Sequence, residues 1–485
     1  MATARSRPTA AREPMSRVDT AWLCMERPTN PMMITGVLMF AEPMSIDGLK
    51  RVIKQRFLAY TRFRQMAVAT ATGATWQTDE DFELDWHVQQ VALPGRGGKR
   101  ALERFVSQLA SSPLNHSRPL WQFHLVERYN GGSALVARIH HSYADGIALV
   151  QVLLSLTDTT RVPAKASELS RVWLKKDHLA VARRVGAVDK YLKIGSTVVE
   201  KGLELYRHPT LAAVLAKEGG EIARELLNLL VLPDDPPSLL RGKLGVSKRV
   251  AWAEPLDLEE VKAVGRACDC TVNDVLMATA AGALREYMID RGDDVDGLTI
   301  RATVPVNLRP LEHARQLGNQ FGLVFLDLPV GEGNPIRRVQ RITEGMNKLK
   351  GSRQAIVAFG LLATLGMAPS IVQDFAFELF SRKATVVATN VPGPQQPLYM
   401  AGCALTEMMV WVPQTGSIGI GISILSYNGR VHFGLIVDGK LVPDPHAVTE
   451  RLRCEFDKLL YLALMADWTV ALNPARAEAL LPAET

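Results

Sequence analysis

The segment Ser133-Ala-Leu-Val-Ala-Arg-Ile-His140-His141-Ser-Tyr-Ala-Asp145-Gly146 joins a predicted strand to a predicted helix. Its first part follows the turn pair Gly131-Gly132 and has the composition of a strand. After Gly146, apolar residues recur at helical spacing, at Ile147, Val150, Leu153 and Leu154. Because side chains alternate along a strand, His140 and His141 are predicted to point to opposite faces. One of them can then face a cleft while the other packs beneath it.

Three chemistries use residues of this kind. A metal site needs three or four ligands, and no second cluster of His, Cys or Asp lies nearby in the sequence. A serine triad of the hydrolase type needs a G-x-S-x-G turn, which the chain lacks. A single histidine acting as general base on a hydroxyl fits, and such a base contributes roughly 100- to 10,000-fold in rate. The structural alternative is two core histidines, with Asp145 as the N-cap of the helix.

The spacing H-H-x-x-x-D-G resembles the signature of CoA-dependent acyltransferases related to chloramphenicol acetyltransferase and to peptide-synthetase condensation domains. Further segments, in order along the chain, make it similar to the bacterial wax ester synthase/diacylglycerol acyltransferase family. The resemblance runs from about Met15 to Leu464. The segments that carry it are Pro119-Leu120-Trp121, Asn273-Asp274, Gly318-Asn319-Gln320-Phe321-Gly322, Asn390-Val391-Pro392-Gly393-Pro394 and Ser426-Tyr427-Asn428-Gly429.

The resemblance implies an α/β (α+β) fold. It would have two chloramphenicol-acetyltransferase-like lobes, each a mixed sheet flanked by helices, with an active-site tunnel between them. The expected organisation is a disordered basic tail (1–14), an N-terminal lobe (15–165), a basic helical linker (166–245), a C-terminal lobe (246–470) and a C-terminal tail (471–485).

The resemblance also implies an O-acyltransferase that uses acyl-CoA as co-substrate and binds no cofactor. His141 would be the general base that removes a proton from an alcohol, and transfer would be direct, without an acyl-enzyme. His140 would support it, while Asp145 and Gly146 shape the loop. The acceptor would be a fatty alcohol, giving wax esters, or diacylglycerol, giving triacylglycerol; the sequence does not rank the two.

Related acyltransferases pair the aspartate of this motif with a distant arginine that holds the loop. Arg309 is the candidate partner of Asp145, and Arg301 is the second candidate. This ion pair would position the loop and would carry no proton.

Four further residues are candidates for lining the cleft, namely Asn273, Asp274, Asn390 and Trp121. For Asn273 and Asp274 the simpler interpretation is helix capping, since a carboxylate in the first turn favours the helix dipole. Trp121 stands at the start of a predicted strand, where fixing a corner is the favoured interpretation.

The composition is that of a soluble globular protein, with 47% hydrophobic and 22% charged residues among 485. This length predicts two or three domains. The five cysteines are odd in number and scattered, which favours a reducing, cytoplasmic compartment over a disulfide framework. Residues 1–14 lack a secretory signal. The apolar run Ala355–Val372 is interrupted by Gly and Pro, so a buried helix or the lining of an acyl tunnel is predicted in place of a membrane span.

A basic segment follows the first predicted lobe. Between Arg171 and Lys217 there are ten basic and four acidic residues, and an apolar helical stripe runs through the segment. A basic amphipathic helix can lie on anionic lipid, which would put the protein peripherally on the inner membrane or on lipid inclusions. The alternative is a connecting helix packed on a domain. Nucleic acid is not favoured, because no aromatic-rich basic platform accompanies the charge.

Two other functions compete with this one. A condensation-type acyltransferase would use a carrier-bound acyl group, but the chain has no attached carrier or adenylation domain. A non-enzymatic peripheral coat protein of lipid droplets or membranes would use the basic segment, and it leaves the His-His-Asp-Gly constellation unexplained.

Overall fold

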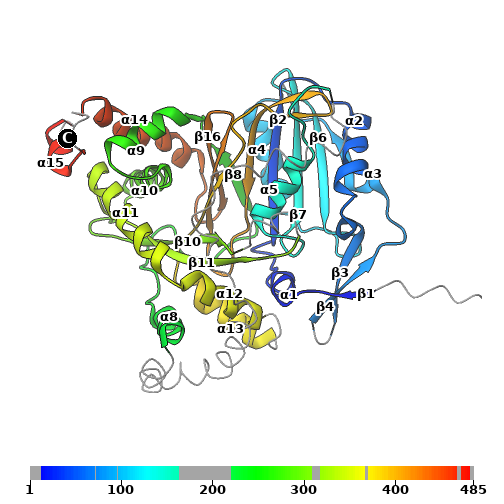
Figure 1. Cartoon of the computed structure of the whole chain (residues 1–485), viewed down its shortest axis with the longest axis horizontal. Coiled ribbons are helices and arrows are strands. Elements are labelled where there is room, and N and C mark those ends of the chain that lie inside the picture. The colour runs from blue at the N-terminus through cyan, green and yellow to red at the C-terminus, as the bar shows by residue number, and fades with distance from the viewer. Residues whose placement is uncertain are drawn as a thin grey trace, which may run out of the picture.

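The computed structural model describes residues 12–70, 73–95, 97–162, 220–308, 317–365, 370–466 and 471–480. In these parts of the chain, two large mixed sheets lie side by side, each flanked by helices (Figure 1). A small three-stranded sheet, in the order β1-β4-β3, extends below the N-terminal one. The expected α/β class with mixed sheets is confirmed.

The N-terminal sheet has the order β13-β14-β2-β7-β6-β5. Its centre is β2 paired antiparallel with β7, and Met33 lies opposite His140. Helices α2 and α5 pack on one face through residues such as Leu49 and Leu149, while α4 packs on the other through Leu102 and Val106. The elements are β2 (Met33–Phe40), α2 (Ile46–Val52), β5 (Val88–Val91), α4 (Lys99–Ala110), β6 (Trp121–Tyr129), β7 (Gly132–His140) and α5 (Gly146–Ser155).

The chain returns to this first sheet late in the sequence. Strand β14 (Cys403–Trp411), extended by β13 (Tyr399–Met400), pairs antiparallel with β2, so that Trp411 lies opposite Thr35. Both strands fall in the range expected for the C-terminal lobe, 246–470. By hydrogen bonding they belong to the N-terminal sheet, so the two halves are connected through a shared sheet as well as through surface packing.

The second sheet has the order β11-β10-β12-β15-β16-β8, with β9 also paired to β16. Strands β10, β12 and β15 run parallel, and the outer pairs are antiparallel. The elements are β8 (Lys248–Trp252), β9 (Leu256–Asp257), β10 (Ile300–Asn307), β11 (Phe321–Leu328), β12 (Val386–Pro392), β15 (Ile420–Tyr427) and β16 (Arg430–Asp438).

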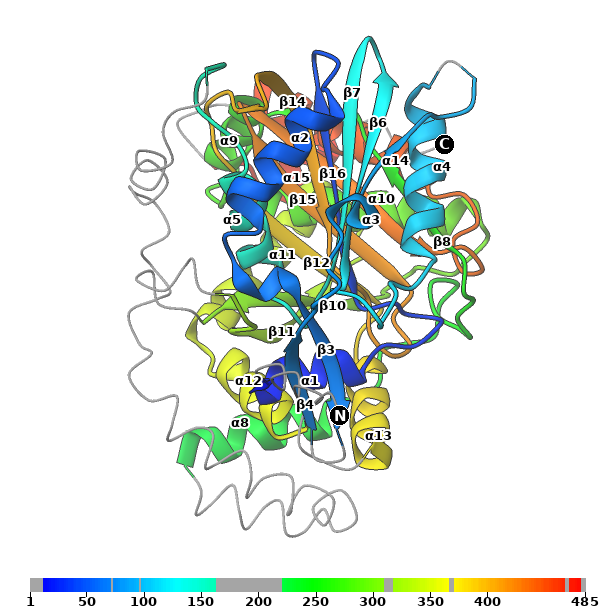
Figure 2. The ribbon, with the colours of Figure 1, turned by 90° about the vertical axis from the view of Figure 1, so that its right-hand side faces the viewer.

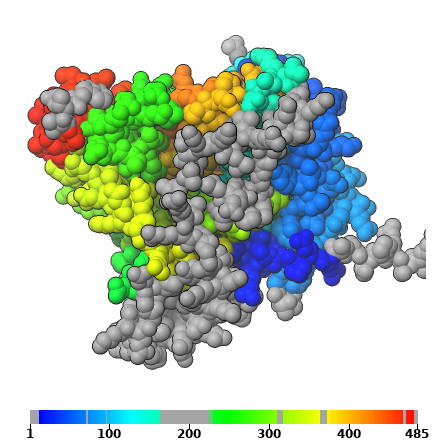
Figure 3. Space-filling model, in the orientation of Figure 1, coloured from blue at the N-terminus to red at the C-terminus, as the bar shows by residue number. Residues whose placement is uncertain are grey.

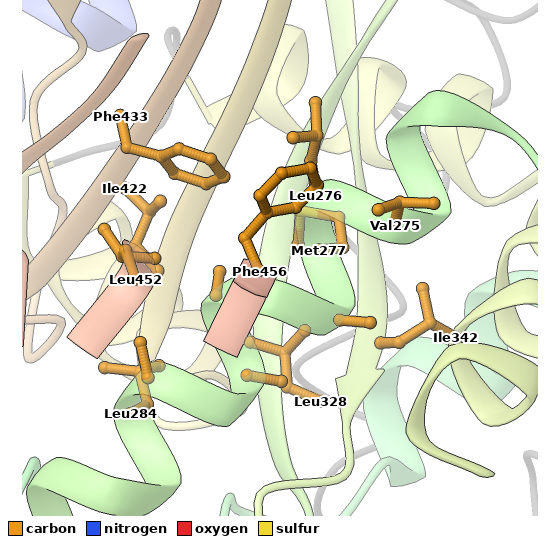
Figure 4. Packing of buried hydrophobic residues seen from close by; sticks show 14 of the residues in the cluster. Val275, Leu276, Met277, Leu284, Leu328, Ile342, Ile422, Phe433, Leu452 and Phe456 are labelled. Carbon is orange, nitrogen blue, oxygen red and sulfur yellow. The ribbon is translucent and has the colours of Figure 1, made fainter. Parts of the chain in front are cut away.

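Helices cover this second sheet and form the largest core. Leu276, Met277 and Leu284 of α10 meet Leu452 and Phe456 of α14 over the strands (Figure 4). The middle of α10, from Val275 to Leu284, is buried on all sides, which agrees with its almost wholly apolar sequence there. The helices are α9 (Leu258–Ala267), α10 (Val272–Asp290), α11 (Pro335–Gly351) and α14 (His446–Leu464).

The remaining elements lie around the edges of the sheets. Figure 2 shows α1 beside α12 at the base of the molecule, close to the β3–β4 hairpin. The structure contains α1 (Arg17–Cys24), β3 (Gln65–Thr70), β4 (Gly73–Thr78), α3 (Leu84–His87), α8 (Gly220–Val231), α12 (Gln354–Leu365), α13 (Ser370–Ser381) and α15 (Pro474–Leu480).

At the N-terminal end one expectation is wrong, and at the C-terminal end the expected tail contains a helix. Residues Arg12–Pro14, expected in a disordered tail, form β1, because they pair with the exposed edge of β4. Residues 474–480, expected in a C-terminal tail, form α15, whose Ala477 is fully buried in the core beside α11.

The apolar run Ala355–Val372 contributes to two helices, α12 and α13. Within the described ranges, no helix combines the length and apolarity needed to cross a bilayer. The described residues are the coloured part of the surface in Figure 3. The basic segment Arg171–Lys217 lies outside them, so its role as a lipid-binding or connecting helix stays a prediction.

The packing of α14 on α10 predicts that replacing two leucines of α14 by alanine lowers the free energy of unfolding by different amounts. Leu452 is 2% exposed and lies in the core, whereas Leu464 is 67% exposed at the end of the same helix. Leu452→Ala should lower the free energy of unfolding by about 2–5 kcal/mol, and Leu464→Ala by less than about 0.5 kcal/mol. Denaturant unfolding of both variants measures the difference. Equal costs would contradict this packing.

Candidate active site

His141 follows the last residue of β7 and is almost fully enclosed, with 3% exposure. Its backbone N–H donates to the carbonyl oxygen of Met32 at 2.7 Å, which fixes the loop against the start of β2. Its ring stacks on the indole of Trp22, with centroids 3.9 Å apart and planes inclined by 19°. The ring of Phe321 on β11 is tilted by 49° relative to the same imidazole, with the two centroids 5.7 Å apart. The catalytic candidate is therefore held between an N-terminal helix and the second sheet.

Helix α1 brings Trp22 to this ring and Asp19 to Asn319, which contacts the backbone of His141. Ser16 caps the helix, since its hydroxyl accepts from the N–H of Asp19 at 3.1 Å. Asp19 and Trp22 are three residues apart and so share one face of the helix. Both are buried, with 6% and 4% exposure.

Asn319 joins α1 to the loop of residues 141–145 between β7 and α5, here called the histidine loop. Its amide Nδ2 donates to Asp19 Oδ1 at 2.7 Å and to the carbonyl oxygen of His141 at 2.9 Å. Its backbone N–H donates to the same Asp19 oxygen at 3.1 Å. One buried amide thus connects three segments of the chain that are far apart in sequence.

Asp145 ties the loop to the same segment from the other side. Its Oδ1 caps α5 by accepting from the N–H of Ala148 at 2.8 Å, and its Oδ2 accepts from the N–H of Gln320 at 3.1 Å. Beside it, Ala144 and Gly318 form a parallel bridge, and Gly318 has φ +108, a conformation that favours glycine. These contacts support the loop-positioning role expected for Asp145.

His140 packs beneath the loop with no exposed surface. Its Nδ1 accepts from the backbone N–H of Ser142 at 3.1 Å and lies 2.8 Å from the Ser142 hydroxyl. Since Nδ1 is an acceptor, the proton of the neutral ring is assigned to Nε2, which lies 3.8 Å from Glu26 Oε1. The two histidines thus contact different groups, as strand alternation predicts.

Burial sets the protonation of the site. It lowers the pKa of His141 to about 3 and that of His140 to about 4, because the charged ring loses its hydration. Burial also raises the pKa of Asp19 to about 6, with the hydrogen bonds from Asn319 opposing that rise. The His141 imidazole is therefore neutral at physiological pH, the form that a general base requires.

Gly146 is the first residue of α5, and a Cβ there would meet Val412 at 3.0 Å. Arg309 lies outside the described residues, so its ion pair with Asp145 stays a prediction. Arg301, the second candidate, is engaged elsewhere, with its Nε 3.5 Å from Asp235 Oδ1.

Two of the cleft candidates lie side by side. Asn390 of β12 donates from Nδ2 to Asn273 Oδ1 of α10 at 2.9 Å. Asp274 forms a capping box with Thr271, which is the capping role that the sequence favoured. Whether these residues line a cleft stays a prediction.

Trp121 is fully buried in the core of the N-terminal half. Its Nε1 donates to the carbonyl oxygen of Phe63 at 2.8 Å, and its ring stacks on His87 with centroids 4.2 Å apart. These contacts are those expected of a residue that fixes a corner, and its role at the site stays a prediction.

All five cysteines are free. Over the described ranges, no group of three or more His, Cys, Asp and Glu side chains is placed to hold a metal ion.

Sequence reasoning missed four residues that enclose His141, namely Asp19, Trp22, Asn319 and Phe321. Asn319 and Phe321 belong to a segment quoted only for its resemblance, Gly318–Gly322. The motif Ser16-x-x-Asp19, a capping pattern, was the available signal for α1. Nothing in the sequence places that helix against the histidine.

Solved structures share this fold. The wax ester synthase/diacylglycerol acyltransferase from Marinobacter aquaeolei matches with a TM-score of 0.65 and 22% identity, covering 93% of this chain and 99% of its own. The first condensation domain of the calcium-dependent antibiotic synthetase matches with a TM-score of 0.58 and 16% identity, covering 96% and 98%. The fold class is therefore that shared by these acyltransferases and condensation domains.

Sequence comparison defines the family. The model of the wax ester synthase/diacylglycerol acyltransferase catalytic domain matches residues 15–276, and that of the family's C-terminal domain matches residues 317–460. A probable diacylglycerol O-acyltransferase from Mycobacterium tuberculosis is 30% identical over 441 residues, covering 88% of this chain and 94% of the relative. The chain belongs to the wax ester synthase/diacylglycerol acyltransferase family, and it is an acyltransferase.

The buried carboxyl of Asp19 predicts a pH dependence of stability. Its folded pKa of about 6 lies above the unfolded value, so the folded state binds this proton more tightly. Ionisation of Asp19 therefore destabilises the folded state as pH rises from about 4 to 6. Asp19→Asn removes this penalty and should gain up to about 3 kcal/mol relative to wild type between pH 4 and pH 7.

Denaturant unfolding across this pH range measures the gain. Asp85→Asn is the control, since the Asp85 side chain is 82% exposed, and it should follow the wild-type profile. Parallel profiles for Asp19→Asn and wild type would contradict the buried carboxyl.

Proposed function

We propose that this protein transfers a long-chain acyl group from acyl-CoA directly to the hydroxyl of a lipid acceptor, with His141 as general base. The observation that carries the proposal is a neutral imidazole fixed at a strand-to-helix loop where the two halves of the molecule meet. The loop contacts α1, β2 and the start of β11.

In the proposed reaction, His141 removes the proton of the acceptor hydroxyl, and the oxygen attacks the thioester carbonyl. The tetrahedral intermediate carries a negative oxygen, which hydrogen-bond donors must stabilise. Its collapse forms the ester bond and breaks the carbon–sulfur bond, and the imidazolium returns its proton to the CoA thiolate. The imidazole is thus restored at the end of each turnover, and no bond to the protein forms.

The surrounding residues hold the base and take no part in the bond changes. Asp145 caps α5 through the N–H of Ala148 and connects the loop to residues 318–320 through the N–H of Gln320, and Asn319 donates to the backbone carbonyl of His141. His140 packs below the loop, where its Nδ1 accepts from the backbone N–H of Ser142. A base held in one geometry avoids the entropic cost of finding it during the reaction.

We propose fatty alcohols and diacylglycerol as the acceptors, giving wax esters and triacylglycerol. The family name supports both acceptors, and the name of the relative from Mycobacterium tuberculosis supports diacylglycerol. Because these acceptors partition into lipid, we propose that the protein works at the inner membrane or at the surface of lipid inclusions. A tunnel that admits acyl-CoA from one side and the acceptor from the other is part of this proposal.

Release of thiol from palmitoyl-CoA, with and without hexadecanol or dioleoylglycerol, tests the proposal. Wild type should release thiol only with an acceptor, and lipid chromatography should show the matching ester. His141→Ala should reduce turnover by roughly 100- to 10,000-fold, because the base is lost. His446→Ala is the matched control, since His446 lies on α14 against Glu103 and outside the histidine loop.

Near-normal turnover of a folded His141→Ala variant would refute the assignment of the base. Activity with a carrier-bound acyl group and none with palmitoyl-CoA would instead favour the condensation-type reaction.

A further inference from the structure

Trp22 is the closest aromatic neighbour of the proposed base, and the reaction described so far gives it no role. Its indole covers the His141 ring at a centroid distance of 3.9 Å, with the planes 19° from parallel. It is 4% exposed, and its Nε1 meets no hydrogen-bond partner among the described residues. The indole therefore contacts His141 through its ring face, and helix α1 carries it there.

The reaction creates a positive charge at this ring. Burial disfavours the imidazolium strongly, so a base in this position is weak unless something stabilises its charged form. Four other histidines in the described ranges lie within 4 Å of a carboxylate oxygen: His116 and His140 by Glu26, His432 by Glu407, and His446 by Glu103. His141 has no such carboxylate in those ranges.

Among the described residues, the charged and titratable groups near the ring come from three segments. His140 precedes it on β7, Asp145 lies on the loop that follows, and Asp19 reaches the backbone of His141 through Asn319. Asp145 is engaged by two backbone N–H groups. Glu26 faces His140, on the other side of the strand. The face of the His141 ring is covered by Trp22.

We propose that Trp22 stabilises the imidazolium form of His141 through a cation–π contact, and so makes a deeply buried histidine effective as a base. The negative face of an indole attracts a cation within about 6 Å of its centroid, and tryptophan is the strongest of the aromatic residues in this role. The contact is stronger with the imidazolium than with neutral imidazole, so it favours the charged transition state over the resting enzyme.

The geometry of α1 supports this role over simple filling of space. Asp19, on the same helix face, is fixed by two hydrogen bonds from Asn319, and the same Asn319 amide holds the carbonyl of His141. The indole and the imidazole are thus held by one network, which keeps the rings stacked. Trp22 is a positioning residue in this proposal, since it acts through His141 and not on the substrate.

The proposal rests on His141 as the base, and a graded series at one position tests it. Tryptophan carrying one, two or three fluorines is placed at position 22 alone, and kcat is measured with palmitoyl-CoA and hexadecanol. Each fluorine withdraws charge from the ring face with little change of shape. Stepwise falls in kcat are expected, with KM nearly constant. Loss of the π face in Trp22→Leu should lower kcat by on the order of 10- to 30-fold. Trp22→Phe keeps an aromatic face and should lower kcat by less.

The same fluorinated series at Trp121 is the control, because that indole is buried in the core and stacks on His87. Its kcat should not follow the number of fluorines. At position 22, a kcat that does not change with the number of fluorines would overturn the proposal. A rising series would also overturn it, because fluorine makes the indole N–H a better donor and a rise would show that the N–H, not the face, acts. If His141→Ala stays active, the proposed base fails instead.

Discussion

The structure depends on the joint between the histidine loop and residues 318–320. Asn319 donates to the carbonyl of His141, Gln320 donates to Asp145, and Gly318 bridges Ala144. A buried carbonyl or carboxylate left without these donors would lower the free energy of unfolding by about 1–3 kcal/mol or more. The hydrogen bonds between the loop and residues 318–320 are therefore expected to form together. Because the loop ends β7 of the first sheet and residues 318–320 lead into β11 of the second, the joint sets where the two sheets meet.

Other contacts across the molecule reinforce that position. Strands β13 and β14 belong to the first sheet, although β12 before them and β15 after them belong to the second. The buried ammonium of Lys248 on β8 donates to Asp438 of β16 and to Asn30 in the segment before β2. The proposed base therefore lies in a tightly packed setting whose burial lowers its pKa. In our proposal, the indole of Trp22 stabilises the charged ring, which no carboxylate of the described residues contacts.

Much of this could be predicted from the sequence. The strand ending at His140, the helix beginning at Gly146 and the Asp145 cap follow from local pattern, and the motif resemblance identified the family and the fold class. The environment of His141 could not be predicted, because Asp19 and Asn319 meet only through tertiary folding across 300 residues of sequence. The return of β14 to the first sheet was missed for the same reason, since strand pairing of this kind leaves no local signal. Arg301 was the second candidate partner of Asp145 on the basis of the family resemblance, but in the structure it contacts Asp235, which is distant in sequence.

The central claim is that the His141 imidazole takes the proton of the acceptor hydroxyl. A crystal structure of the protein with hexadecanol and a thioether analogue of palmitoyl-CoA, which cannot react, tests it most directly. The account predicts the alcohol oxygen about 2.6–3.2 Å from His141 Nε2, on the side facing the carbonyl-equivalent carbon of the analogue. An alcohol bound out of reach of that nitrogen, with another side chain at its hydroxyl, would contradict it.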